Sequence, residues 1–248
     1  MSPLSFLRSV YLWTVGLGYI GPVLLIVLIR SYFEAPESYD AWLTRKLRTL
    51  FKLLFSTPLV EFAEPIPKDR PLIFMANHSS LIDIPLLKAV IPEYFRGIIA
   101  HDQLHYPLYG RVVERMGNIP IYRDNIRKSL RSFETAKALI SQGTNITVLP
   151  EGNRSLDGHL LPFRKLPFYF AKQSGACIVP IAISGVFKMN NKHSFHLNPG
   201  NIVVRFAPII DEKEVAELDE QRLLEMTRER IYSKLESFEA GETENDMV

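Results

Sequence analysis

LIFMANHSSLIDIPLLKAV, residues 72–90, contains a short apolar run, a polar turn and a second apolar run. The first run, at 72–76, is bounded by a proline and an asparagine, which predicts a buried strand. Pro85 is tolerated only near the start of a helix, so we expect a helix to begin within 80–83 and to include 86–90. The stretch therefore predicts a strand, a polar loop and a helix in direct succession.

Strand and helix patterns continue to alternate downstream of this unit. Each predicted strand is a short apolar run, and each predicted helix carries its apolar residues at helical spacing. We expect further strands at 98–100, within 117–123, and at 146–149, 177–183 and 202–206. Further helices are predicted at 108–116, at 126–142 and at 211–240. Alternating strands and helices predict one α/β domain whose sheet is covered by helices on both faces.

The N-terminal part of the chain is far more apolar. Residues 10–29 are 20 uncharged, mostly apolar residues, and a helix of that length is about long enough to cross a bilayer core. Glycines and Pro22 interrupt the middle of the run, and the proline favours a kink. Two arrangements stay open: one kinked transmembrane helix, or a re-entrant pair of half-helices in one leaflet. A cleaved signal peptide is not expected, because no small-x-small cleavage site follows the run.

A basic amphipathic helix is predicted at 41–55, AWLTRKLRTLFKLLF. Its basic residues fall mostly on one face, and the opposite stripe holds Leu43, Leu47, Leu50, Phe51 and Leu54. This pattern is typical of a helix that lies in a membrane interface, although a surface helix packed on its own domain has the same pattern. More basic residues follow the apolar run than precede it. If the run spans a membrane, the positive-inside rule therefore places the main domain in the cytoplasm.

These patterns divide the chain into four parts. Residues 1–58 form membrane-anchoring helices, which comprise the apolar run and the amphipathic helix, and residues 59–210 form the α/β domain. Residues 211–240 form a helix packed on that domain, and residues 241–248 form a disordered tail.

The net charge of +2 conceals an asymmetry along the chain. Residues 211–248 hold 13 acidic and 5 basic side chains, which leaves a balance of +10 on the first 210 residues. A basic body suits anionic partners such as phosphate groups and acidic lipid surfaces. A nucleic-acid-binding module would cluster its basic residues without a membrane segment, so nucleic acid is not an expected partner.

His78 lies on the predicted loop between strand and helix, five residues before Asp83. One continuous helix would separate the two side chains by about 140°, but a turn of the chain between them lets them meet. A carboxylate bonded to one imidazole nitrogen fixes the tautomer and leaves the other nitrogen free to take a proton. Such a pair can activate a hydroxyl by general-base catalysis. Alternatively, Ser80 and Asp83 form a capping box that only closes the helix.

Three further motifs follow or form predicted strands. In PEGNRS, residues 150–155, Gly152 lets the backbone approach a ligand and Arg154 offers a planar fork that grips phosphate. Glu151 can orient that arginine or a ligand hydroxyl. GNIPIYR, residues 117–123, is a strand that delivers Arg123 to the same sheet edge, and VPIAISG, residues 179–185, is a core strand. Each motif alone also fits an ordinary polar turn or strand end.

Together the four motifs resemble the four sequence blocks of the glycerolipid acyltransferases, in the order and spacing of the bacterial 1-acyl-sn-glycerol-3-phosphate (lysophosphatidic acid) acyltransferases. The resemblance covers about residues 70–210. It implies a single mixed α/β sheet flanked by helices, as in glycerol-3-phosphate acyltransferase. It also implies that His78 is the general base and that Asp83 supports it. The same resemblance assigns the acceptor's glycerophosphate to the second and third blocks, at Arg123, Glu151, Gly152 and Arg154, and assigns structure or acyl-donor binding to Pro180.

The sequence departs from the family pattern at three positions. Asn153 stands where the third block usually has threonine, and Leu166 stands where a glycine often follows the lysine. His101 replaces a lysine that is common before the second helix. These departures leave the reaction type intact and bear on the preference for acceptor head group and acyl donor.

The resemblance implies transfer of a fatty acyl chain from acyl-CoA or acyl-carrier protein to the sn-2 hydroxyl of lysophosphatidic acid, which gives phosphatidic acid for phospholipid biosynthesis. No cofactor is expected beyond the co-substrate, and no covalent enzyme intermediate. The expected partners are membrane lipids, the lysophospholipid acceptor and the acyl donor. The expected location is the cell membrane (inner membrane), with the catalytic domain on its cytoplasmic face.

Other interpretations remain beside this one. The acceptor could be glycerol-3-phosphate or a lyso-aminolipid, or the chain could be a non-catalytic lipid-binding protein on the same scaffold. Retention of both His78 and Asp83 argues against the last, because binding alone needs neither. No metal is expected, because His101 and His105 have a suitable spacing but no evident third ligand.

Overall fold

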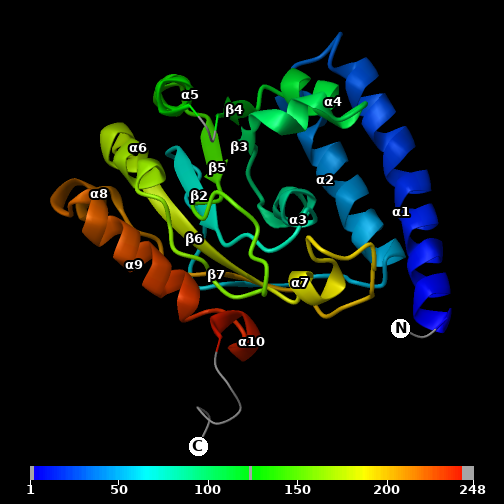
Figure 1. The fold of residues 1–248 in the computed structure, drawn as a ribbon. Coiled ribbons are helices and arrows are strands. Elements are labelled where there is room, and N and C mark those ends of the chain that lie inside the picture. The colour runs from blue at the N-terminus through cyan, green and yellow to red at the C-terminus, as the bar shows by residue number, and fades with distance from the viewer. Residues whose placement is uncertain (1–2, 123–124, 242–248) are drawn as a thin grey trace, which may run out of the picture.

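Seven strands form a single sheet in the computed structural model, which describes residues 3–122 and 125–241 (Figure 1). The strand order is β1-β7-β6-β2-β5-β3-β4. All neighbours run parallel except β6 and β7, which are antiparallel, so the predicted mixed α/β sheet is confirmed. The strands are β1 (Leu59–Phe62), β2 (Leu72–Ala76), β3 (Phe95–Ala100), β4 (Ile119–Ile121), β5 (Asn145–Val148), β6 (Cys177–Ser184) and β7 (Val203–Phe206).

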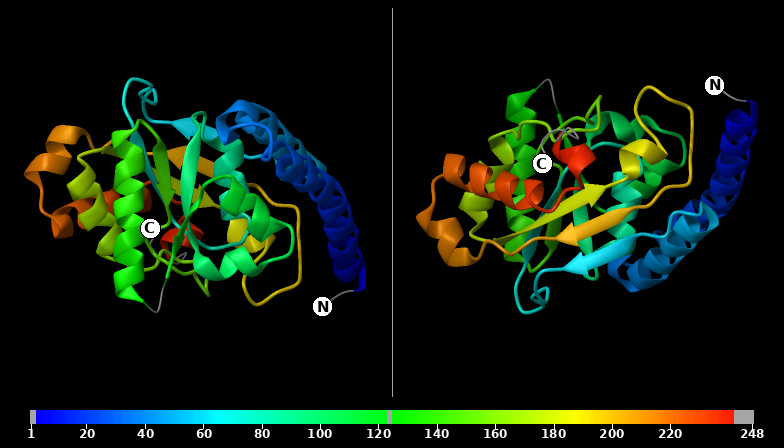
Figure 2. Two further views of the ribbon diagram at one scale, coloured as in Figure 1. Left: turned by 90° about the horizontal axis from the view of Figure 1, so that it is seen from above. Right: turned by 90° about the horizontal axis from the view of Figure 1, so that it is seen from below.

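Helices cover both faces of this sheet (Figures 1 and 2). On one face lie α2 (Pro36–Leu53) and α3 (Asp83–Val90), with α1 (Pro3–Arg30) outside them. On the other lie α5 (Ile126–Ser141), α6 (Leu166–Ser174) and α9 (Glu220–Tyr232). The short helices are η1 (His101–His105), α4 (Tyr109–Arg115), α7 (Val186–Met189), α8 (Glu212–Glu217) and α10 (Ser237–Ala240).

Strand β2 is the centre of both hydrophobic cores. All five of its residues are buried, and they alternate between the two faces of the sheet. Leu72, Phe74 and Ala76 pack with the apolar residues of α2 and α3. Ile73 and Met75 pack with those of α5, α6 and α9. A strand buried on both faces cannot hold polar side chains, so the first polar residues of this unit appear where β2 ends, at the edge of the sheet.

The apolar N-terminal run lies within one continuous helix, α1, of 28 residues, which includes Pro22. The predicted alternative of two re-entrant half-helices is therefore wrong. Near its start, the Ser9 hydroxyl donates a hydrogen bond to the Leu197 carbonyl at 3.1 Å. Just past its end, the Arg115 guanidinium donates to the Ser31 carbonyl at 2.9 Å. Helix α1 thus lies along the domain and is fixed to it near both ends (Figure 2).

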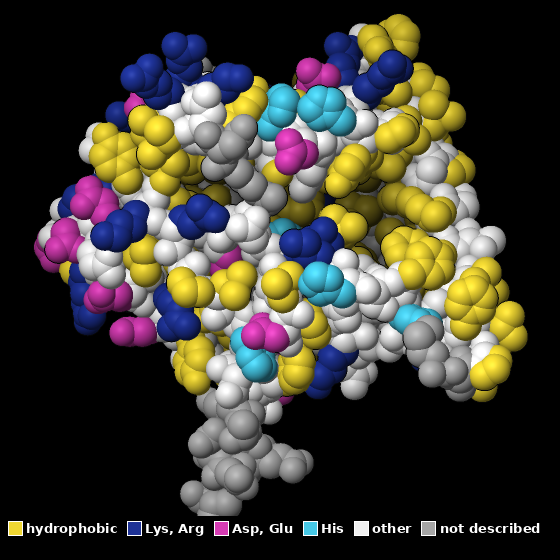
Figure 3. All heavy atoms as spheres, viewed as in Figure 1, with side chains coloured by type: hydrophobic (Ala, Val, Ile, Leu, Met, Phe, Trp, Pro, Cys, Tyr) yellow, Lys and Arg dark blue, Asp and Glu magenta, His cyan; other side chains and the backbone are white. Residues whose placement is uncertain are grey.

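The outer side of α1 is apolar and exposed (Figure 3). By length and composition, α1 is the one described helix that could cross a membrane. This exposed apolar side indicates association with a membrane. Its large exposed side chains are Leu4, Phe6, Leu7, Val10, Tyr11, Leu17, Leu25, Ile26 and Ile29.

The sequence pattern predicted that the apolar stripe of α2 faces a membrane interface. The structure does not have this arrangement. The stripe at positions 43, 47, 50, 51 and 54 is buried inside the protein, in the core that α2 shares with α1 and α3. The alternative, a helix packed on its own domain, is the arrangement found. The sequence could not separate the two because an amphipathic pattern records only that one face leaves water, not what covers it.

Helix α2 also holds the C-terminal end of α3. Thr44 Oγ1 donates to the Lys88 carbonyl at 3.1 Å, and Arg48 Nε donates to the Ala89 carbonyl at 2.7 Å. The buried Lys88 ammonium forms an ion pair with Asp40 of α2. The last carbonyls of a helix have no partners within it, so these side chains satisfy them and fix α3 in place.

The C-terminal segment is three separate helices, α8, α9 and α10, rather than the single helix predicted at 211–240. Asp211 caps α8 in a capping box with Glu214, and Asp219 caps α9. The two caps restart the helix at new angles, which a continuous apolar stripe does not reveal. Of the predicted tail at 241–248, residues 242–248 lie outside the described residues.

Candidate active site

His78 and Asp83 meet at the carboxyl end of β2. The chain turns between the strand and α3, which brings His78 Nδ1 to 2.8 Å from Asp83 Oδ2. The His78 side chain is 10% exposed and that of Asp83 only 1%. With Nδ1 bonded to the carboxylate, Nε2 is the nitrogen left for a substrate.

Asp83 also shapes the loop that carries the histidine. The same oxygen, Oδ2, accepts the backbone N–H groups of Ser79 and Ser80 at 2.7 and 2.8 Å. One of the two hydrogen bonds of the predicted capping box is therefore present, because the carboxylate accepts from the Ser80 N–H. The Ser80 hydroxyl accepts from the Ile82 N–H at 3.3 Å rather than from that of Asp83. Asp83 therefore orders the turn and orients the imidazole with one oxygen. The other oxygen, Oδ1, is buried without a hydrogen-bond partner in the described part of the chain.

Glu151 clamps the backbone of His78. Its Oε1 accepts the His78 N–H at 2.7 Å, and its Oε2 accepts the Leu161 N–H at 3.2 Å. The Ser155 N–H donates to the His78 carbonyl at 2.8 Å. The loop after β5 therefore bonds both the backbone N–H and the backbone carbonyl of His78. Because both carboxylate oxygens of Glu151 are engaged with backbone groups, this side chain is placed to position His78 rather than to face a ligand.

Burial raises the pKa of Glu151 to about 8. Its two backbone hydrogen bonds lower that pKa, and the nearby Asp83 raises it further. The folded chain therefore holds the Glu151 proton more tightly than the unfolded chain, where the pKa is near its ordinary value of 4.5. This linkage stabilises the fold below about pH 4.5, and the stabilisation is lost as the pH rises through about 8.

We expect Glu151→Gln to flatten the dependence of stability on pH. The difference in unfolding free energy between wild type and variant should favour wild type most at low pH and shrink steadily toward pH 8.5. An amide nitrogen cannot accept a backbone N–H, so the variant should also lose about 1–3 kcal/mol at low pH. Urea unfolding from pH 5 to 9 measures both effects. A difference that stays constant over this range would contradict the raised pKa.

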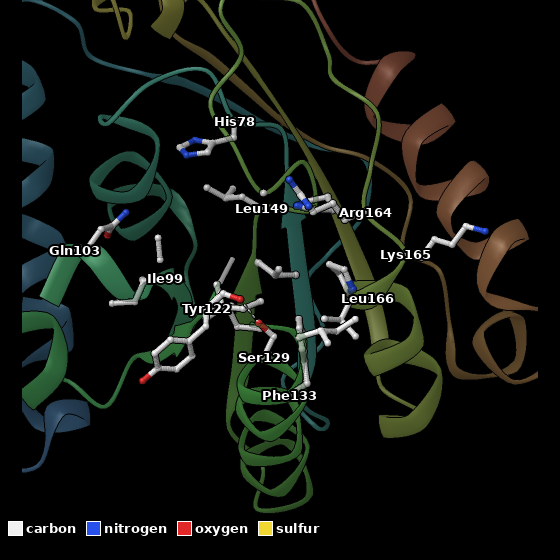
Figure 4. Close-up of a pocket in the computed structure, with 18 of the residues that line it drawn as sticks. His78, Ile99, Gln103, Tyr122, Ser129, Phe133, Leu149, Arg164, Lys165 and Leu166 are labelled. Atoms are coloured by element: carbon white, nitrogen blue, oxygen red, sulfur yellow. Dashed lines mark hydrogen bonds between the residues drawn. The ribbon is translucent and has the colours of Figure 1, made fainter. Parts of the chain in front are cut away.

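An apolar cavity of about 300 Å³ lies beside His78 (Figure 4). It is open at the carboxyl ends of the parallel strands, where ligands bind in sheets of this kind. His78 lies at one end of the cavity and Phe133 at the other (Figure 4). The apolar walls between them include Ile98, Ile99, Ile121, Val148, Leu149 and Leu166.

The other residues predicted for the site are only partly brought together. Gly152 lines the cavity, and its φ of +73° is a left-handed conformation that favours glycine. Arg154, two residues on, is half-buried and does not line the cavity. Pro180 is buried within β6 opposite Met75, which fits the structural role, and it does not line the cavity. Arg123 lies outside the described residues.

Arg164 lines the cavity although no sequence motif pointed to it. Its backbone N–H donates to the Pro150 carbonyl at 2.9 Å, and its Nε donates to the Glu151 carbonyl at 3.3 Å. The only sequence signal was a basic pair shortly after the third block. The return of the loop over Gly152, rather than any spacing, brings Arg164 to the cavity.

His101, one of the three departures from the family pattern, packs flat against Tyr122. The two ring centroids are 4.4 Å apart, and His105 meets His101 edge-on. Within residues 3–122 and 125–241, no three His, Cys, Asp or Glu side chains are grouped closely enough to hold a metal ion.

This arrangement suits general-base chemistry on a substrate with a long apolar part. The buried carboxylate holds the histidine in one tautomer and can stabilise the positive ring that forms when Nε2 takes a proton. The adjoining cavity offers the mostly apolar walls that such a substrate needs.

Comparisons with known proteins show which family the chain resembles. A profile of the Acyltransferase family matches residues 58–184, about half of the chain. The 1-acyl-sn-glycerol-3-phosphate acyltransferase of Cocos nucifera is 34% identical over 139 residues, which cover 55% of this chain and 45% of that protein. That of Borreliella burgdorferi is 26% identical over 179 residues, or 72% of each chain. The chain spans about half the length of the plant relatives it matches.

The fold has a solved counterpart as well. The crystal structure of the 1-acyl-sn-glycerophosphate (LPA) acyltransferase PlsC from Thermotoga maritima superposes with a TM-score of 0.78. The match covers 92% of both chains at 26% sequence identity. The profile match takes in both His78 and Asp83 and ends at the last residue of β6. The chain therefore belongs to the acyltransferase family.

Proposed function

We propose that this protein transfers a fatty acyl chain from a thioester donor to the sn-2 hydroxyl of lysophosphatidic acid, which gives phosphatidic acid. The observation that carries the proposal is the His78–Asp83 pair at the mouth of an apolar cavity. The names of the related proteins support the choice of acceptor. The donor is acyl-CoA or acyl-carrier protein.

The reaction needs one base and no covalent enzyme intermediate. His78 Nε2 takes the proton of the acceptor hydroxyl as that oxygen attacks the thioester carbonyl carbon. The carbon–sulfur bond then breaks, and the imidazolium returns its proton to the leaving thiolate. Asp83 stabilises the imidazolium between these two steps. The apolar cavity takes the acyl chain, and Arg123 and Arg154 are proposed to contribute positive charge for the acceptor phosphate.

An acceptor panel tests this function. The full chain, purified in detergent, is assayed with one acyl-CoA against lysophosphatidic acid, glycerol-3-phosphate, a lyso-aminolipid and monoacylglycerol. The proposal expects the highest kcat/KM with lysophosphatidic acid. A higher value with any other acceptor overturns the assignment of the acceptor. No transfer to any of them would favour a non-catalytic lipid-binding protein.

We propose that the protein acts at the cytoplasmic face of the cell membrane, with α1 as its anchor. Because α1 is fixed along the domain near both ends, it presents a side rather than an end to the bilayer. Its exposed apolar residues would enter the interface while the opposite side stays packed on the domain. Lysophosphatidic acid is a membrane amphiphile, so such an anchor brings the cavity to the acceptor.

Replacing Leu7, Leu17 and Leu25 together by glutamine should weaken binding to anionic vesicles by on the order of 100-fold. These leucines are 62%, 59% and 51% exposed on α1, and burying a leucine is worth about 1.5–3 kcal/mol when complete. Vesicle flotation measures the bound fraction. The matched control is Leu130→Gln, an exposed leucine of α5, which lies on the other face of the sheet from α1 (Figure 1). Equal binding by the triple variant and the control would show that α1 is not the anchor.

A further inference from the structure

Arg164 carries a positive charge into the catalytic cavity without an acidic partner. Figure 4 shows its guanidinium beside Leu149, at the same end of the cavity as His78. No carboxylate among the described residues forms an ion pair with it. Glu151, whose backbone carbonyl accepts from Arg164, has both carboxylate oxygens occupied by backbone N–H groups. The guanidinium is therefore available to an anion from outside the chain.

The third block is shaped around this side chain. A Cβ atom at Gly152 would lie 2.5 Å from Arg164 Nε and 2.8 Å from its Cδ, so the arginine crosses the loop directly over this glycine. The Glu151 carbonyl accepts from Nε at 3.3 Å, which fixes the stem. The Asn153 amide, with its oxygen toward the guanidinium, accepts from Nη2 at 3.1 Å. These contacts engage Nε and one terminal nitrogen, and the other terminal nitrogen has no hydrogen-bond partner among residues 3–122 and 125–241.

We infer that Arg164 binds the phosphate of the acceptor and thereby places its hydroxyl at His78. This assignment rests on the proposed function. It adds to Arg123 and Arg154 a cation that lines the cavity itself, whereas Arg154 does not line it. It also explains the asparagine at 153, where the family usually has threonine: its amide reaches the guanidinium and holds the fork in place.

The neighbouring cation, Lys165, provides a matched control. It follows Arg164 directly, is also exposed and also lines the cavity, but Figure 4 shows the amino end of its side chain pointing away from the cavity. If general surface charge promotes lipid or donor binding, replacing either residue by alanine should lower kcat/KM. If the cavity binds a phosphate through Arg164, only the replacement of Arg164 should lower kcat/KM.

The experiment compares wild type, Arg164→Ala, Arg164→Lys and Lys165→Ala with lysophosphatidic acid and with monoacylglycerol as acceptors. Arg164→Ala should lower kcat/KM for lysophosphatidic acid by about 10- to 100-fold, because it removes charge-assisted hydrogen bonds. The loss with monoacylglycerol should stay below about threefold. Arg164→Lys should recover part of the loss, since lysine keeps the charge but not the fork. Lys165→Ala should behave like wild type.

A phosphate could also belong to the donor, so a second arm replaces acyl-CoA by an acyl N-acetylcysteamine thioester, which has no phosphate. If Arg164 binds the acceptor phosphate, Arg164→Ala should lower kcat/KM for lysophosphatidic acid with this donor as well. A defect that disappears with it assigns Arg164 to the donor and overturns the inference. Equal losses on both acceptors also overturn it, as does an unchanged kcat/KM in a folded Arg164→Ala variant. Wild type that fails to acylate lysophosphatidic acid would instead refute the proposed function.

Discussion

His78→Ala should lower turnover by about 10² to 10⁴ while the chain stays folded. His78 Nδ1 is held by Asp83 at 2.8 Å, so Nε2 is the group that can accept the proton of the acceptor hydroxyl. Alanine removes this base and leaves the hydroxyl to attack without general-base assistance. The acceptor should still bind, because the arginines proposed to bind its phosphate and the apolar cavity walls are unchanged. We therefore expect the loss in kcat with little change in KM.

The structure indicates that this variant remains folded. Glu151 and Ser155 hold the backbone of residue 78, which alanine retains. Asp83 keeps the N–H groups of Ser79 and Ser80. His193→Ala is the matched control, because His193 is an exposed histidine distant in sequence from the site. A folded His78→Ala variant that turns over within about threefold of wild type would refute the mechanism.

Asp83→Asn should cost almost as much turnover, roughly 10²-fold or more. The amide oxygen can still accept from Ser79, Ser80 and the imidazole, so the loop can keep its shape. The negative charge that stabilises the imidazolium is lost. The amide nitrogen then lies where Oδ1 is now, a buried position without a hydrogen-bond partner among the described residues. An unsatisfied buried donor costs about 1–3 kcal/mol of stability, which thermal or urea unfolding measures.

The double variant separates a shared mechanism from two independent roles. If the carboxylate acts only through the imidazole, His78→Ala combined with Asp83→Asn should turn over about as slowly as His78→Ala alone. Single-turnover rates of the four proteins, each with its unfolding free energy, make this comparison. Losses that multiply would assign Asp83 a role in catalysis apart from His78.

The order of elements could be predicted from the sequence because it depends on local patterns. The run at 72–76 is apolar on both faces, and Pro85 allows a helix only near its start, so the strand, loop and helix around His78 follow from neighbours in the chain. Strand β1 and helix α6 were not predicted. Glu61 interrupts the apolar residues of β1, and the first six residues of α6 are all apolar, so they show no helical period.

By itself, then, the sequence determined the α/β domain, the His78–Asp83 pair and the membership of a family, because these depend on residue type and spacing. Only the tertiary structure decided what each polar and apolar face meets. In the folded chain the apolar stripe of α2 lies in the protein core. Glu151 accepts the backbone N–H of His78, and Arg164 crosses Gly152 to reach the cavity. The physical reason is that burial and charge pairing depend on segments distant in sequence. Glu151 is buried because the loop after β5 returns over the end of β2, and no pattern within either segment records that contact.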